Sequence, residues 1–193
     1  KGVGSLVGTF DTADPDPADT HIYTLVPGPG DRDNPLFVVT GNQLYTAAIF
    51  DFELQTLHTI RVQTDDGNGG LFEDLVAIAV INVDEAPTNL VLSATTVPEN
   101  APQGTSVGML TTVDPDSADT HAYSLVAGAG DADNGLFSVV GNELQTMIPL
   151  DFETRSTCSI RVQTEDAGGA VYQKIVSITV IDVNEAPTDI ALN

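Results

Sequence analysis

Acidic side chains gather at four kinds of place in this chain of 193 residues, and each kind occurs twice. They form an Asp-Pro-Asp, an Asp-Phe-Glu, a pair of acids before a Gly-containing turn, and an acidic segment ahead of an Ala-Pro. Calcium is bound in proteins by about six to eight oxygens from carboxylates, amides and backbone carbonyls. A single Asp-Pro-Asp is more often a turn, because Asp and Pro are common turn residues. The joint recurrence of all four clusters therefore favours cation binding.

The charge balance excludes two classes of partner. The chain has 28 Asp and Glu against 6 Lys and Arg, a formal net charge of −22. Nucleic-acid binding needs a basic surface, and anionic membranes attract basic segments. Hydrophobic residues make up 41% of the chain, which indicates a folded core and not disorder. No apolar run has the length of a membrane span and the first residues do not resemble a signal peptide, so we expect a mature or excised piece.

The four clusters belong to an internal repeat with an offset of 100 residues. Residues 14–16 return as 114–116, and residues 60–64 return as 160–164. The repeat predicts two homologous domains, residues 1–87 and 88–193, because Pro87 ends a strand. Residues that match Pro98-Glu99-Asn100 would precede Lys1. The first copy is therefore expected to have a truncated N-terminal strand, and the chain to come from a longer array.

Apolar residues alternate with a period of two in both copies, as in Val176, Ile178 and Val180. This alternation predicts β-strands, and Gly-rich and Asn-rich turns separate them. No segment has a sustained helical period. Short strands at this spacing predict an all-β fold with a sandwich of about seven strands in each copy.

The acids lie at the predicted strand ends and in the linker between the copies. Loops of a β-sandwich gather at its two ends. A short linker would bring the acids of one copy opposite those of the next, and carboxylates packed so closely favour protonation or a cation. A divalent ion between the copies resolves the repulsion.

At this point the chain resembles the cadherin family over nearly its whole length. Pro98-Glu99-Asn100 is similar to the family's Pro-Glu-Asn, residues 51–53 and 151–153 to its Asp-Arg-Glu, and residues 114–116 to its Asp-Ala-Asp. Both linkers resemble the family's Asp-x-Asn-Asp-Asn-Ala-Pro but are one residue shorter. The sequence around residues 119–125 and 184–188 resembles the cadherin-like repeats of large bacterial surface and secreted proteins. The resemblance implies two tandem Greek-key, immunoglobulin-like β-sandwich domains with calcium between them.

The resemblance also implies the ligands, residue by residue. The calcium site between the repeats takes Asp51, Glu53, Asn82, Asp84, Glu85, Asp114, Asp116 and Asp166. Secondary half-sites at the outer ends, which lack a neighbouring repeat, take Glu99, Asp151, Glu153, Asp182, Asn184, Glu185, Asp14, Asp16 and Asp66.

Several other residues have a plainer interpretation. Asp131-Ala-Asp-Asn-Gly135 begins like an EF-hand loop, but Asn142 occupies the twelfth position where a Glu is needed, so a solvated turn is expected. His21 and His121 are expected at strand edges and not as metal ligands. Cys158 alternates inward and is expected to be a buried, inert thiol. Paired carboxylates also occur in glycosidases, but every pair here recurs in both copies, so no enzyme is expected.

The predicted function is a calcium-rigidified tandem module of an extracellular or cell-surface bacterial protein that serves adhesion, between like molecules or to another surface. The full-length protein is expected to be membrane-associated. Two alternatives stay open: a carbohydrate-binding module with a polysaccharide ligand, and a passive spacer in a multidomain secreted protein. The lack of Trp speaks against the carbohydrate alternative.

Overall fold

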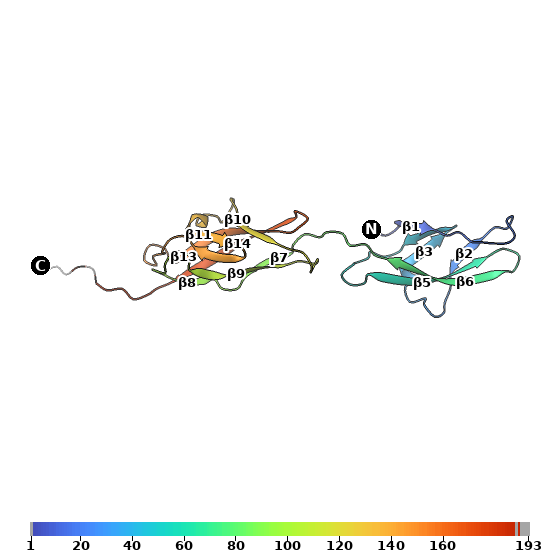
Figure 1. Cartoon of the computed structure of the whole chain (residues 1–193), viewed down its shortest axis with the longest axis horizontal. Helices are drawn as coiled ribbons and strands as arrows, with labels where there is room; N and C mark the ends of the chain where they lie inside the picture. The colour runs from blue at the N-terminus through green and yellow to red at the C-terminus, as the bar shows by residue number, and fades with distance from the viewer. Residues whose placement is uncertain (1, 188, 190–193) are drawn as a thin grey trace. The chain divides into compact units, whose positions relative to one another are not determined.

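The computed structural model describes residues 2–187 and 189 and divides the chain into two compact units, Lys1–Val83 and Asp84–Asn193 (Figure 1). The linker residues 84–87 thus pack with the second unit, whereas the sequence repeat places the domain boundary after Pro87. Thr188, the last residue of the repeated Glu-Ala-Pro-Thr, lies outside the described residues, as do the two chain ends at residues 1 and 190–193.

The first unit is a sandwich of two three-stranded sheets. One sheet has the order β1-β4-β3 and the other the order β2-β5-β6. The strands alternate inward and outward, as β5 shows by burying His58, Ile60, Val62 and Thr64. The elements of this unit are β1 (Leu6–Thr9), β2 (Ile22–Leu25), a 3-10 turn (Asn34–Leu36), β3 (Phe37–Thr40), β4 (Gln43–Thr46), β5 (Leu57–Asp65) and β6 (Leu71–Ala79).

The second unit is a sandwich of two four-stranded sheets, β11-β12-β9-β7 and β10-β13-β14-β8. All described pairings are antiparallel except that of β8 with β14. The elements of this unit are β7 (Asn89–Leu92), β8 (Thr96–Pro98), β9 (Ser106–Val113), β10 (Ala122–Leu125), a 3-10 turn (Asn134–Leu136), β11 (Phe137–Val140), β12 (Glu143–Thr146), β13 (Thr157–Glu165) and β14 (Val171–Ile181).

The predicted all-β class and the two Greek-key sandwiches are confirmed. Among the described residues, helix is limited to the two 3-10 turns. No helix in this part of the chain is long and apolar enough to cross a membrane. About seven strands were predicted for each copy. The described residues form six strands in the first unit and eight in the second.

The difference in strand count comes from β7 and β8. The other six strands of the second unit have counterparts 100 residues earlier, but the offset carries β7 and β8 to positions before residue 1. The burial of the neighbouring strand differs between the two units. Ile178 and Val180 of β14 are 0% and 1% exposed, whereas their counterparts Ile78 and Val80 are only partly buried.

The prediction of a solvated turn at residues 131–135 is wrong for the central residue, Asp133. Asp133 is buried, accepts the backbone N–H of Ser159 over 2.7 Å and forms an ion pair with Arg155. Its counterpart Asp33 is also buried and accepts the N–H of Thr59. The motif therefore ties its loop to the long strand β13 in the second unit and to β5 in the first. The sequence pattern could not show this, because strand β13 comes 24 residues later in the chain.

Candidate metal centre

Three described carboxylates of the second unit converge at the end that carries the β13–β14 hairpin. One oxygen each from Asp84, Asp119 and Asp166 lies within 4.8 Å of the others. Asp84 comes from the linker segment, Asp119 from the loop between β9 and β10, and Asp166 from the hairpin. The three are therefore brought together from separate parts of the sequence by the sandwich topology.

Two of these carboxylates carry oxygens that lack a hydrogen-bond partner. The Oδ2 atoms of Asp119 and Asp166 are buried and have none among the described residues. Asp166 itself is only 6% exposed, and its other oxygen accepts the backbone N–H of Ala170 over 2.8 Å. An unsatisfied buried carboxylate oxygen is costly, and native proteins usually pair or coordinate such groups. The donor set, which consists of hard anionic oxygens, fits calcium.

The charge of the cluster acts on Asp84. Burial raises the pKa of Asp84, and the carboxylates of Asp166, Asp119, Asp116 and Asp114 raise it further. A divalent cation relieves the same repulsion without protonation.

The backbone is shaped around Asp84. A Cβ atom placed on Gly168 would lie 2.0 Å from Asp84 Oδ2, far closer than any contact between real atoms. Gly168 therefore leaves the space that the Asp84 carboxylate occupies. The first copy has Asn68 at the matching position. The sequence alone did not predict this contact between Asp84 and Gly168, because the two residues are 84 positions apart in the chain.

Asp114 and Asp116 lie in the same unit and are held in place by their neighbours. His121 Nε2 lies 2.8 Å from Asp114 Oδ2, and the backbone N–H of Asp116 donates to Asp114 Oδ1 over 3.0 Å. The N–H of Glu85 donates to Asp116 Oδ2 over 2.8 Å. His121 thus orients a predicted ligand, a role that its expected place at a strand edge did not include. His21 contacts Asp14 in the same way.

Asp119 is the residue that sequence reasoning missed. It ends the segment Asp-Pro-Asp-Ser-Ala-Asp at residues 114–119 and recurs as Asp19 at the same offset of 100. Recurrence was the signal that could have found it. In the first unit, Asp14, Asp16 and Asp19 also gather within 4.8 Å.

A second group of acids lies at the opposite end of the second unit. Glu99, Glu153 and Asp182, all expected at one half-site, have oxygens within 4.8 Å of one another. Glu99 is 2% exposed, and its two oxygens accept the N–H groups of Phe152 and Val183, each over 2.8 Å. A backbone hydrogen bond lowers the pKa of Glu153, but burial and the carboxylates of Glu99, Glu185 and Asp182 outweigh it and leave the pKa raised.

The remaining predicted residues of this half-site have other contacts or lie in solvent. Asp151 caps the turn before β13 by accepting the N–H and hydroxyl of Thr154, which lowers the pKa of Asp151. Glu185 accepts a hydrogen bond from Asn100, and Asn184 is exposed after β14.

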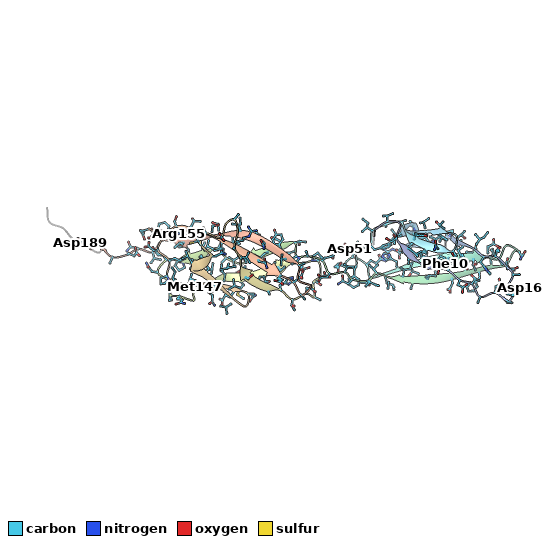
Figure 2. All side chains as sticks on the ribbon, turned by 90° about the horizontal axis from the view of Figure 1, so that it is seen from above. Phe10, Asp16, Asp51, Met147, Arg155 and Asp189 are labelled. Carbon is cyan, nitrogen blue, oxygen red and sulfur yellow. The ribbon has the colours of Figure 1, made fainter. Side chains whose placement is uncertain are left out.

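The predicted residues of the first unit lie at its two ends. Figure 2 shows Asp16 and Asp51 at opposite ends of this unit. Asp51 and Glu53 occupy the turn before β5, and Asn82 follows β6. Asp66 lies in the β5–β6 hairpin near Asp14, lining the same pocket. The structure does not relate Asp51, Glu53 and Asn82 to the acids of the second unit, so their joint site stays a prediction.

Comparison with known proteins finds a family match within the second unit. Residues 93–183 match the family model of the cadherin domain. The whole chain is 28% identical to human cadherin-12 over 211 aligned residues, covering 98% of this chain and 26% of that protein. It is 33% identical to human protocadherin gamma-A1 over 141 residues, covering 70% of this chain and 15% of that protein. The cadherin part of the resemblance is therefore confirmed, although this chain spans well under two thirds of these relatives.

Solved cadherin structures share the fold of both units. The crystal structure of human protocadherin-24 EC1-2 matches with a TM-score of 0.75 at 20% identity, covering 94% of this chain and 91% of that one. The protocadherin GammaB4 extracellular domain matches with a TM-score of 0.71 at 22% identity, covering 95% of this chain and 30% of that one. At these identities the likeness concerns the fold.

The raised pKa of Asp84 predicts how pH changes the stability of the metal-free chain. A carboxyl whose folded pKa is raised stabilises the fold below its unfolded pKa, and this stability is lost as pH rises through the folded pKa. In chelator at neutral pH, Asp84→Asn should therefore melt above the parent chain. The advantage should shrink as the pH falls towards about 4. Calorimetric scans at several pH values measure the difference in melting midpoint. If the parent chain is the more stable one at neutral pH, then charge repulsion at Asp84 does not destabilise the fold.

Proposed function

We propose that this chain is a calcium-binding tandem of cadherin-like repeats whose relative orientation is fixed by the ion. The observation that supports it most is the pair of buried, unpartnered oxygens on Asp119 and Asp166 beside Asp84. The second support is the match of residues 93–183 to the cadherin domain.

The proposed ligands of the site between the repeats combine both copies. Asp119 joins the predicted set on the strength of its place in the cluster. Asn82 supplies an amide oxygen, and the others supply carboxylates. The set is Asp51, Glu53, Asn82, Asp84, Glu85, Asp114, Asp116, Asp119 and Asp166. The cluster of Glu99, Glu153 and Asp182, with Asp151, Asn184 and Glu185, is proposed as the corresponding half-site towards a following repeat. Asp14, Asp16 and Asp66, with Asp19, are proposed to face a preceding one.

The protein's own residues prepare the site before an ion arrives. Gly168 makes room for Asp84, His121 holds one oxygen of Asp114, and the Ala170 amide fixes one oxygen of Asp166. Such neighbours orient ligands and reduce the conformational freedom lost on binding. Calcium, when bound, supplies the positive charge that lets opposed acids approach. The linker is then expected to stiffen, which stabilises one arrangement of the repeats by mass action.

The biological role that fits this module is adhesion at an extracellular or cell surface, with a membrane-associated full-length protein and no enzymatic activity. The bacterial source rests on the repeat wording alone. The test is self-association measured by light scattering with calcium and with chelator. Calcium-dependent association of like molecules supports homophilic adhesion. A monomer in both conditions contradicts it and favours the passive spacer.

One observation favours carbohydrate binding as a second candidate. Phe72 is 64% exposed and lines a pocket of about 420 Å³ in the first unit, together with Asp14, His21 and Asp66. An exposed aromatic ring beside acidic and imidazole groups is suited to a sugar. A polysaccharide pull-down with the parent chain and Phe72→Ala separates this function from adhesion, because only a carbohydrate site loses retention with the ring.

A further inference from the structure

The dipeptide Asn-Gly occurs once in each unit, at two different places in the fold. Asn68-Gly69 lies in the β5–β6 hairpin, and Asn134-Gly135 begins the 3-10 turn ahead of β11. The offset of 100 carries neither dipeptide onto the other, because residues 168–169 are Gly-Gly and residues 34–35 are Asn-Pro. The chain therefore holds the same two residues in two different surroundings, which makes the effect of those surroundings directly comparable.

An Asn followed by Gly can react with its own backbone. The nitrogen of the following residue attacks the side-chain carbon Cγ of the Asn, and Gly favours this attack because it has no Cβ to shield the nitrogen or restrict the backbone. A C–N bond forms at Cγ, the bond from Cγ to Nδ2 breaks, and ammonia leaves with the proton of the Gly N–H. Water then opens the cyclic imide at either carbonyl and leaves Asp or isoaspartate. The reaction needs a side chain that is free to turn and a Gly N–H without a partner.

Asn68 meets both conditions. It is exposed, and Asp66 Oδ1 accepts the N–H groups of Asn68 and Gly70 over 2.7 and 2.9 Å. The N–H of Gly69, which lies between them, has no hydrogen-bond partner among the described residues, and the Asn68 side-chain amide has none either. A Cβ atom placed on Gly69 would meet nothing within 4 Å, so the space around this residue is open. The hairpin therefore leaves the reacting atoms unrestrained.

The side chain of Asn134 is held at both of its polar atoms. Oδ1 accepts the backbone N–H of Arg161 over 2.9 Å, and Nδ2 donates to the carbonyl of Val126 over 3.0 Å. Asn34 makes the same two kinds of bond in the first unit, so this arrangement belongs to the repeat. Both bonds must break before Cγ of Asn134 can approach the nitrogen of Gly135.

We propose that Asn68 is a site of spontaneous deamidation in the folded chain, whereas Asn134 is protected by its two hydrogen bonds. Water is the only co-reactant, and the modification does not depend on the proposed calcium function. The product carries one more negative charge, and its isoaspartate form also has one more methylene in the main chain. The extra methylene changes the hairpin around Asp66, whose N–H donates to the carbonyl of Gly70 over 3.1 Å.

The test is peptide mass spectrometry on the whole chain after incubation at mildly alkaline pH, with isoaspartate separated from Asp by chromatography. The peptide with Asn68 should gain about 1 Da at least about tenfold faster than the peptide with Asn134. A tenfold difference corresponds to about 1.4 kcal/mol, which lies within the net strength of two hydrogen bonds. In concentrated urea the two rates should come within about threefold of each other, because unfolding releases the Asn134 side chain.

Asn68→Gln is the matched control, because it keeps the amide but would need a larger ring. It should abolish the mass gain in the hairpin and leave the rate at Asn134 unchanged. Asn68→Asp has the new charge without the methylene, so amide exchange at Asp66 should quicken in the isoaspartate product and not in this variant. Equal rates at Asn68 and Asn134 in the folded chain, or a reaction at Asn68 in urea alone, would overturn the proposal.

Discussion

Removing calcium is expected to lower the melting midpoint of the second unit by roughly 10 °C or more. An ion present at a hundred times its dissociation constant stabilises the folded state by about 2.7 kcal/mol, and each kcal/mol shifts the midpoint of a small domain by about 4–8 °C. The physical reason is that the acids around Asp84 lose their counter-charge. Scanning calorimetry with calcium and then with excess chelator measures the shift.

The control for this experiment is magnesium at the same concentration. Magnesium demands a tighter octahedral geometry and gives up its water reluctantly, so it should restore only a small part of the loss. Solution scattering on the same samples is expected to show a more variable arrangement of the two repeats in chelator. Identical midpoints and scattering with and without chelator would refute a stabilising role for the ion.

Asp166→Asn is expected to weaken calcium binding without destabilising the calcium-free chain. In calcium the variant should bind the ion at least about tenfold more weakly, a loss of roughly 1.4 kcal/mol or more, because a buried charged oxygen is replaced by an amide. In chelator the variant should be as stable as the parent chain or more stable, because one charge leaves a repelling cluster. Paired calorimetric scans and calcium titrations measure both effects.

The matched control is Asp74→Asn, which removes the same charge from the exposed face of β6. Asp74 accepts the backbone N–H of its neighbour Leu75 over 2.8 Å. This variant should leave calcium affinity unchanged. If Asp166→Asn destabilises the chain equally in calcium and in chelator, then Asp166 is a structural hydrogen-bond acceptor for the hairpin and not a ligand.

The long strands were predictable because their pattern is local. Val176, Ile178 and Val180 alternate in sequence and are buried together in β14. The exact offset of 100 also carries six strands from one unit to the other. Burial of Cys158 followed from the same alternation: the side chain is 0% exposed, and burial raises the pKa of its thiol.

What the sequence could not supply depends on contacts between distant segments. The parallel pairing of β8 with β14 joins residues more than 80 positions apart. The burial of Asp133 and the packing of Asp84 against Gly168 likewise depend on tertiary contacts. Asp119 belongs to a motif that the sequence does reveal. Its position in the cluster, however, depends on a turn in which its N–H donates to the carbonyl of Asp116 over 3.0 Å. Local pattern thus predicts which segments carry acids, and the fold decides which oxygens meet.

Calcium titration of this chain by isothermal calorimetry tests the central claim most directly. The account predicts saturable binding of at least one ion per chain, with a large loss of affinity in Asp166→Asn and no loss in Asp74→Asn. Titrations without binding heat at millimolar calcium, or with equal affinity in the parent chain and Asp166→Asn, would contradict the proposed centre at Asp84, Asp119 and Asp166.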